Sequence, residues 1–230
     1  MIAAIHQPNY LPWMGYFYKI VNCDIFVFLD NVQYTKNGYI NRNMIKTPQG
    51  AAWLTVGVLT KSRHGQLVSE VEINNSLPWS IIHQKSMFQS YSKAPYFKNY
   101  ASFFQEIYAR KWERLVDLNE ALIKLICQIL GINTVKFLFA SELNVSGHST
   151  ELLVDICQAV DCDIYFSGPS GQDYMDEQFF VNQRITLRYS DFKHPAYNQL
   201  WGDFVPNMSI IDLLFNEGEK SLEILLGASS

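Results

Sequence analysis

The sequence predicts an α/β fold: a parallel core sheet with flanking helices and a helical insertion at about residues 76–130. Three observations support this prediction. The chain opens with a strand, a helix and a second strand. Three helical patterns follow one another in the middle, and strands alternate with helices again after residue 135. Such alternation is typical of a parallel sheet covered by helices.

The opening unit consists of residues 1–5 (MIAAI), 12–22 (PWMGYFYKIVN) and 24–30 (DIFVFLD). The first and last are short apolar runs, as buried strands are. The middle run has apolar residues at helical spacing, and Pro12 suits the first turn of a helix. A strand, a helix and a second strand within about 30 residues predict two parallel strands joined by a right-handed crossover.

The middle of the chain changes from polar turns to helices. Residues 33–50 are polar and rich in turn signals, and residues 52–58 (AWLTVGV) are predicted to be a strand. Residues 76–130 show three helical patterns, and the last has an expected capping box of Asp117 and Glu120.

The last third returns to alternating strands and helices. Its predicted elements are strand 135–143, helix 149–160, strand 163–168, strand 184–192 and helix 209–218. We expect a single domain over residues 1–230, with 76–130 as an insertion or subdomain.

Composition and charge bear on the class of protein. The 230 residues are 48% hydrophobic and 17% charged, with a net charge of −4. No run rich in Lys and Arg appears, so no nucleic-acid partner is expected. No apolar run approaches the roughly 18 residues of a membrane span, and no signal-peptide pattern is present, so a cytoplasmic protein is predicted. The four cysteines match neither a zinc motif nor a disulfide framework, and no metal ligands are predicted.

Three polar loops follow predicted strands: residues 6–13, 30–43 and 167–177. Each combines Asn, Gln or Asp with aromatic residues, which is typical of a site for a hydroxyl-rich or amide-rich ligand such as a sugar. Ligands of open parallel sheets bind beyond the carboxyl ends of the strands. The first two loops should emerge on one edge, because a single crossover joins their strands.

Three side chains in these loops are candidates for chemistry. His6 is a candidate general acid or base, because its ordinary pKa lies near neutrality, and a histidine bonded to the backbone at a strand end is the equal alternative. Asp30 would orient His6, bind a metal or cap a turn. Arg42 would clamp a phosphate or carboxylate, or form a surface ion pair. We predict His6 and Asp30 as catalytic residues of one cleft that Arg42 and the 167–171 loop also border.

The predicted substrate-binding residues lie in the same loops. Gly168 and Gly171 would open backbone amides to an anion, but the Lys-Ser/Thr of a P-loop is missing and a plain strand-to-helix turn is the alternative. The full set is Gln7, Asn9, Tyr10, Gln33, Asn41, Arg42, Gly168, Ser170, Gly171 and Tyr174.

Blocks along nearly the whole chain resemble the WbqC-like protein family. They are IHQPNYLPWMGYFYKI, FLDNVQYTKNGYINRNMIKTPQG, WLTV, YFSGPSGQDYMD and FKHPAYNQLWGDFVPNMSIIDLLFNEG. That family is associated with bacterial O-antigen and other surface-polysaccharide gene clusters, so the resemblance implies a pathway more than a reaction. Its typical blocks map onto His6, Gln7, Pro8, Tyr10, Pro12, Gly15, Asp30, Gln33, Asn41, Arg42, Gly168, Gly171, Tyr174, Gly202 and Asp212.

A weaker similarity is to the HIGH-motif nucleotidyltransferases. PNYLPWMGYFYKIVNCDIFVF has their layout of a proline-bearing loop, a glycine at a helix start and a following strand. The two motif histidines would fall on Trp13 and Tyr16, so the layout is kept while both phosphate-binding histidines are replaced. Likeness of fold alone implies no activity.

Three functions remain open. The leading one is an enzyme of surface-polysaccharide assembly that transfers an acyl or aminoacyl group to a nucleotide-linked sugar. The second is a nucleotidyl-transferring or adenylate-forming enzyme of the HIGH type. The third is a non-catalytic binding subunit of a biosynthetic complex, with the aromatic-rich helices of residues 76–112 as a docking surface. The cofactor is left open, and a small-molecule substrate and a homo-oligomer are both compatible with the sequence.

Overall fold

The computed structural model describes residues 1–61 and 63–227, and its centre is a five-stranded, all-parallel sheet in the order β5-β2-β1-β6-β7. Its strands are β1 (Ile2–His6), β2 (Ile25–Phe28), β5 (Lys136–Phe139), β6 (Ile164–Ser167) and β7 (Thr186–Tyr189). The predicted α/β class with a parallel core sheet is confirmed. The chain starts in the middle of the sheet, builds outward to β5, and then returns to add β6 and β7 on the other side of β1.

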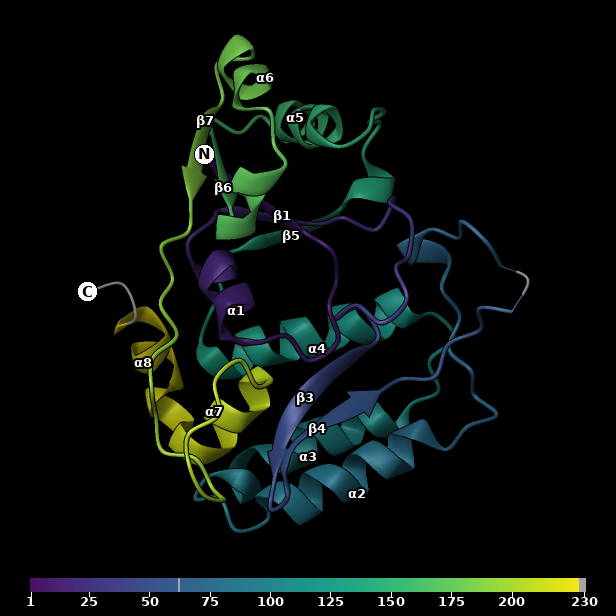
Figure 1. Cartoon of the computed structure of the whole chain (residues 1–230), viewed down its shortest axis with the longest axis vertical. Coiled ribbons are helices and arrows are strands. Elements are labelled where there is room, and N and C mark those ends of the chain that lie inside the picture. The colour runs from purple at the N-terminus through teal and green to yellow at the C-terminus, as the bar shows by residue number, and fades with distance from the viewer. Residues whose placement is uncertain (62, 228–230) are drawn as a thin grey trace.

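Helices cover both faces of this sheet (Figure 1). Helices α1 (Met14–Val21) and α4 (Leu115–Leu130) share one hydrophobic core with Ala4 and Phe26, whereas α5 (Thr150–Ala159) and α6 (Glu177–Asn182) share the other with Ala3 and Ile5. Neighbouring strand residues point to opposite faces, so one strand supplies both cores. The connection after β1 therefore lies on one face, and the connection after β6 on the other.

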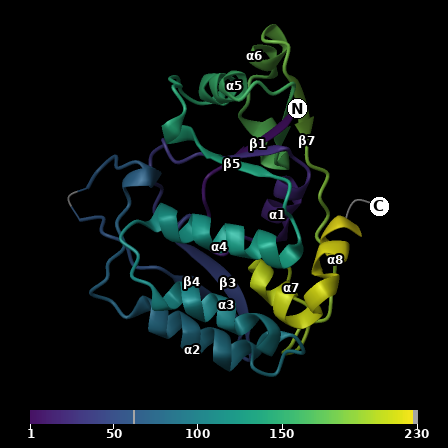
Figure 2. The ribbon, with the colours of Figure 1, turned by 180° about the vertical axis from the view of Figure 1, so that it is seen from behind.

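A second group of elements extends the core beyond α1 and α4 (Figure 2). The aromatic ring of Phe215 packs on those of Tyr91, Phe97 and Phe104 and joins three helices. The group consists of the antiparallel hairpin β3 (Arg42–Thr47) and β4 (Gly50–Thr55), and of helices α2 (Trp79–Tyr91), α3 (Phe97–Ala109), α7 (Ile210–Glu217) and α8 (Ser221–Gly227). Short 3₁₀ turns lie at Val68–Glu70, Ala140–Glu142, Pro169–Asp173 and Gly218–Lys220.

The predicted helical block is present as α2, α3 and α4, but its helices pack on different partners. Helix α4 lies on the sheet, whereas α2 and α3 lie with the β3–β4 hairpin (Figure 1). The buried Asn119 of α4 ties these parts together, because its amide donates to the backbone carbonyls of Pro8 and Ile40, at 2.8 and 2.7 Å. The division into one domain with an insertion or subdomain stays a prediction.

Several local expectations were wrong. The polar stretch 33–50 contains strand β3, because the turn signals around Pro48 close a hairpin between two paired runs, residues 42–47 and 50–55. Helix α4 begins at Leu115 after an extended Arg114, so Asp117 lies inside the first turn and does not cap it.

The other differences concern boundaries. Strand β4 ends at Thr55 rather than at residue 58, and helix α1 begins at Met14, two residues after Pro12. The 3₁₀ turn Pro169–Asp173 and helix α6 were not predicted.

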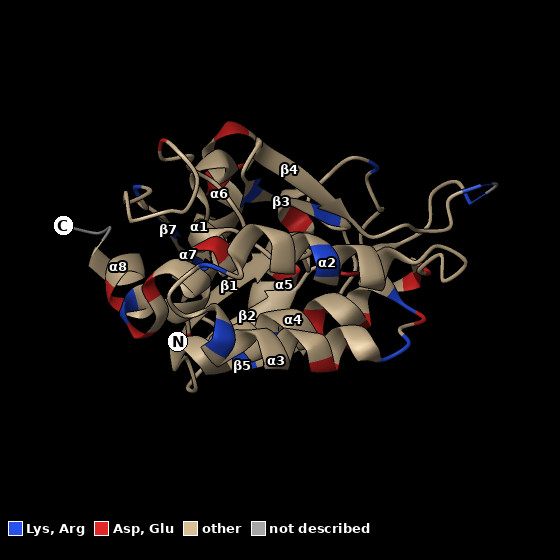
Figure 3. Cartoon of the chain, turned by 90° about the horizontal axis from the view of Figure 1, so that it is seen from below, with Lys and Arg blue, Asp and Glu red and all other residues tan. Residues whose placement is uncertain are grey.

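Charged residues are interspersed along the chain (Figure 3). Basic and acidic residues are scattered over several helices and loops in this view rather than gathered on one element. Among the helices that the structure describes, none is both long and apolar enough to cross a membrane.

Candidate functional site

A cavity of about 460 Å³ lies at the carboxyl ends of β1 and β6. It is lined by residues at the end of β1, by the start and the first turns of α1, and by the segment that follows β6. Strands β1 and β6 are neighbours whose onward connections run over opposite faces of the sheet. In open α/β sheets such a switch point leaves a crevice in which ligands bind. Its volume is within the range of small-molecule sites, roughly 300–1,000 Å³.

His6 is the last residue of β1 and lines this cavity. Its Nδ1 lies 3.0 Å from the carbonyl oxygen of Gln7. A carbonyl only accepts, so in the neutral ring Nδ1 carries the proton and Nε2 keeps its lone pair. Within residues 1–61 and 63–227 no protein group hydrogen-bonds to Nε2.

The imidazole of His6 is held in its neutral form. Burial, and secondarily the positive charge of Lys19, lower its pKa from 6.5 to about 3. The ring also meets the ring of Tyr16 edge-on, with 4.8 Å between centroids. His6 is therefore an oriented, neutral hydrogen-bond acceptor at the cavity wall.

Lys19 is a cavity residue that the sequence analysis missed. Only 5% of it is exposed, and its Nζ donates a hydrogen bond of 3.0 Å to the carbonyl of Ile5. Burial lowers the pKa of the amine to about 8. The signal that would have found it is a single charge within the otherwise apolar helical run MGYFYKIV. A lysine surrounded by large apolar residues on every side of a helix has no face on which to reach water.

The loop after β6 forms the opposite wall. Ser167, Gly168, Ser170 and Gly171 all line the cavity. Gly171 packs tightly, since a Cβ there would lie 2.4 Å from the Ser167 hydroxyl, whereas a Cβ on Gly168 would meet nothing within 4 Å. The loop therefore brings small side chains and backbone close to the cavity.

Aromatic rings complete the cavity. Trp13, Tyr165, Tyr174 and Phe192 line it, and Tyr174 is 61% exposed. Trp13 packs on Phe192 edge-on at 5.5 Å, and its ring is nearly parallel to that of His194 at 6.3 Å. The chain after β7 thus closes one side of the cavity, with rings suited to stacking on a sugar or a base.

The structure therefore brings six of the predicted site residues together: His6, Gln7, Gly168, Ser170, Gly171 and Tyr174 all line the cavity. Their roles as catalytic or binding residues stay predictions. The loop after β1 and the loop after β6 converge as expected.

Asp30 does not line this cavity. Its buried carboxylate accepts hydrogen bonds from the backbone amide of Ser141 at 2.8 Å and from its hydroxyl at 2.6 Å. The reason is the strand order. Strand β2 lies between β1 and β5, so the chain after β2 turns toward the 3₁₀ turn that follows β5, away from β6. The prediction that Asp30 shares a cleft with His6 was therefore wrong, because the Asp30 carboxylate binds Ser141 outside the cavity.

Arg42 also lies outside the cavity, contrary to the expectation that it borders the same cleft. It begins strand β3, where its guanidinium stacks over the Trp53 ring at 4.2 Å and Nη2 donates to the carbonyl of Asn37 at 2.5 Å. The neighbouring Asn41 is buried and donates to the carbonyl of Val56 at 2.9 Å. Both side chains are engaged in the β3–β4 hairpin.

Asn9 and Tyr10 are buried in the protein rather than exposed to the cavity. The hydroxyl of Tyr10 forms hydrogen bonds with Nδ1 of His83, at 2.7 Å, and with the hydroxyl of Tyr108. These contacts tie the loop after β1 to helices α2 and α3, which is the packing role of an aromatic residue with a polar end.

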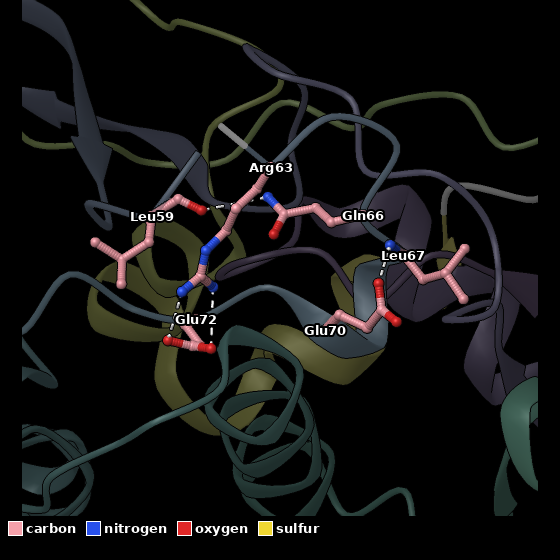
Figure 4. Close-up of polar contacts among 6 residues, drawn as sticks. All are labelled: Leu59, Arg63, Gln66, Leu67, Glu70 and Glu72. Carbon is pink, nitrogen blue, oxygen red and sulfur yellow. Dashed lines mark hydrogen bonds and ion pairs between the residues drawn. The ribbon is translucent and has the colours of Figure 1, made fainter. Parts of the chain in front are cut away.

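Gln33 is exposed and lines a separate hollow of about 270 Å³, together with Arg63 and Gln66. Figure 4 shows that the guanidinium of Arg63 is already paired with the carboxylate of Glu72, at 3.0 and 3.1 Å. The amide of Gln66 donates to the carbonyl of Leu59 at 3.4 Å. The charge of Arg63 is thus already offset by Glu72, which makes it less available to an anionic ligand in this hollow.

Metal ligation has little support in the described part of the chain. No group of three or more His, Cys, Asp or Glu side chains gathers there in an arrangement that would hold a metal ion. The four cysteines are buried and free.

Fold and site together define a doubly wound α/β protein with one histidine-bearing and lysine-bearing cavity at its switch point. The model of the WbqC-like protein family matches residues 7–224, and the chain belongs to that family. It is similar to the "Uncharacterized protein Rv1507c" of Mycobacterium tuberculosis (strain ATCC 25618 / H37Rv), with 38% identity over 225 residues that cover 97% of this chain and 96% of the relative. No solved structure matches.

Proposed function

We propose that this protein transfers an acyl or aminoacyl group to a nucleotide-linked sugar during the assembly of bacterial surface polysaccharide. The pathway is what the family resemblance implies. The reaction class rests on one observation: a neutral histidine, oriented through Nδ1, offers an open Nε2 in a cavity of suitable size.

In the proposed reaction Nε2 of His6 takes the proton of a sugar hydroxyl or amine as that group attacks the acyl carbonyl. The new bond forms between the sugar heteroatom and the acyl carbon. The bond to the leaving group breaks, and the leaving group departs with its electron pair and accepts the proton from the imidazolium. The aromatic rings at Trp13, Tyr174 and Phe192 would hold the sugar or the base by stacking.

Ligand binding is tested first by thermal unfolding with a panel of nucleotide sugars at millimolar concentration. A ligand held at about 100 times its dissociation constant adds roughly 2.7 kcal/mol of stability. The absence of a shift with every member of the panel would contradict the proposal and favour a non-catalytic role.

Transfer is tested next with His6→Ala, which should lose transfer activity while it still binds the sugar nucleotide. The control is His148→Ala, because His148 is an exposed loop histidine outside the cavity. If His6→Ala keeps its transfer activity, His6 is not the general base of the reaction.

A nucleotidyl-transferring enzyme is the second candidate. The order of the sheet and the cavity at its switch point favour it, since mononucleotides bind at such points in doubly wound folds. Trp13 and Tyr16 stand where the HIGH motif has its histidines, so Lys19 and His6 would have to serve the phosphates. Release of pyrophosphate from ATP or CTP in the presence of a sugar phosphate or an amino acid would promote this candidate, and absence of ATP binding by calorimetry would remove it.

A further inference from the structure

From the geometry around Lys19 we infer that the cavity recognises an anionic group of its ligand, a phosphate or a carboxylate, held against Nζ of Lys19 beside His6. The inference rests on the proposed function, because it names the part of the substrate that the same cavity binds. It also extends that function, because it assigns a recognition residue, Lys19, that lies outside the three polar loops and is absent from the set of residues onto which the typical family blocks were mapped.

The charge of Lys19 is almost fully buried and has no acidic partner in the cavity. No Asp or Glu is among the described residues that line the cavity, and Lys19 is the one Lys or Arg among them. One N–H of its ammonium group donates to the carbonyl of Ile5 at 3.0 Å. An ammonium has three donors, so two remain for a ligand. A buried charge without a counter-charge is costly, and an anionic ligand would supply the missing charge.

Two buried serines line the same cavity: the Oγ of Ser167 donates to the carbonyl of Gly168 at 3.2 Å, and the Oγ of Ser190 is the neutral donor left for a ligand. Ser167 and Ser190 line it with 2% and 7% exposure, and the amide of Ser190 donates to the carbonyl of Ser167 at 2.8 Å, which holds the two residues side by side. The Oγ of Ser190 accepts from the amide of Phe192 at 3.3 Å, so its own proton is available to a ligand oxygen. A cation and a nearby hydroxyl are donors from which an oxygen of a phosphate or a carboxylate can accept hydrogen bonds.

An anion at Lys19 would also change the chemistry of His6. The charge of Lys19 is one of the two causes that lower the pKa of the imidazole, the larger being burial. The other titratable groups that line the cavity are the phenols of Tyr16, Tyr165 and Tyr174, and burial raises the pKa of each, so they are neutral at pH 7. A bound anion offsets the repulsion from Lys19 and raises the pKa of His6. Substrate binding would therefore make His6 a stronger base.

The first experiment is calorimetric titration of the full chain with inorganic pyrophosphate, and separately with acetate. Wild-type protein is expected to bind at least one of them, and Lys19→Met should weaken that binding at least about tenfold, because it removes one partner of a buried charge pair. Pyrophosphate binding points to the phosphates of a nucleotide, and acetate binding to the carboxylate of an acyl donor. Lys19→Gln, which removes the charge but keeps a side-chain N–H donor, serves if Lys19→Met does not fold.

The matched control is Lys46→Met. Lys46 is also buried, with 1% exposure, and also donates to a backbone carbonyl, that of Asp203, but it lies outside the cavity. It should keep wild-type anion affinity. Lys124→Met, at an exposed lysine of α4, is the second control in case Lys46→Met does not fold.

The second experiment follows the titration of ¹⁵N-labelled histidine by NMR, with the His6 signal assigned through His6→Asn. In the wild type, pyrophosphate, which unlike acetate keeps a negative charge near the pH at which His6 titrates, should move the His6 titration to higher pH. In Lys19→Met the titration should lie higher without ligand and should no longer respond to it. A purely structural lysine would not give this response.

The inference is overturned if neither anion binds, if Lys19→Met and Lys19→Gln bind as tightly as the wild type, or if Lys46→Met loses affinity equally. Its failure is distinguishable from that of the transferase proposal. If nucleotide sugars bind the wild type and Lys19→Met equally well, the proposed anion site is contradicted and the transferase proposal is not. If the protein binds pyrophosphate through Lys19 but binds no nucleotide sugar, the anion site is supported and the transferase proposal is contradicted.

Discussion

Replacing His6 by alanine should cost little stability although it removes a partly buried aromatic side chain. The imidazole makes one protein hydrogen bond, to the carbonyl of the next residue, and one edge-on ring contact with Tyr16 at 4.8 Å. A hydrogen bond of this kind is worth about 0.5–1.5 kcal/mol, and an aromatic pair about the same. Because the ring borders an open cavity, its loss enlarges that cavity rather than leaving a dry void. The expected loss is therefore about 1–3 kcal/mol, whereas loss of a general base lowers the rate about 10²–10⁴-fold.

Urea unfolding measures the first quantity, and initial rates of group transfer measure the second. Tyr10→Phe is the contrasting variant, because it keeps the ring and removes a buried hydroxyl that bonds to both His83 and Tyr108. Each unsatisfied buried group costs about 1–3 kcal/mol, so this smaller change should destabilise at least as much as His6→Ala. The reasoning is refuted if His6→Ala unfolds the protein while Tyr10→Phe does not, because His6 would then be a structural residue.

Three further outcomes follow from the same contacts. The pKa of His6 lies at about 3 in the folded chain and at 6.5 ordinarily, so its contribution to stability is complete above pH 6.5 and is lost as the pH falls toward 3. Urea midpoints of His6→Asn should accordingly decline less than those of the wild type over that interval. Gly171→Ala places a methyl group 2.4 Å from the Ser167 hydroxyl, so it should destabilise the protein by about 1–3 kcal/mol and weaken ligand binding. Gly168→Ala has free space around the new methyl group and should change neither stability nor binding. Thermal unfolding measures the stability and calorimetry the binding. Asp212→Ala removes the carboxylate that accepts hydrogen bonds from two tyrosine hydroxyls at 2.8 and 2.9 Å. Denaturant unfolding should show that the free energy of unfolding falls by at least about 2 kcal/mol. A smaller fall would mean that water replaces the carboxylate.

The fold class was predictable because it depends on local patterns. Apolar runs at residues 1–5 and 24–30 with a helical run between them are sufficient for a parallel pair, and the structure has β1 and β2 in that arrangement. Strand β3 was missed because one of its buried residues is the polar Asn43. The buried positions of this strand therefore do not show up as an alternation of apolar and polar residues. That asparagine is buried because its amide donates to the carbonyl of Leu11, a partner 32 positions away.

The site was predictable in part, for a physical reason. The sequence by itself determined that His6 ends a buried strand and that the small residues of the 167–171 loop follow another, because both are properties of adjacent residues. Only the tertiary structure decided which loops meet. Strand β6 pairs with β1 on the side opposite to β2, so the 167–171 loop reaches His6, while Asp30 turns to Ser141. It also decided that Lys19, which the sequence places in a helix, is buried at the cavity, because strand order and helix packing depend on contacts between residues far apart in the chain.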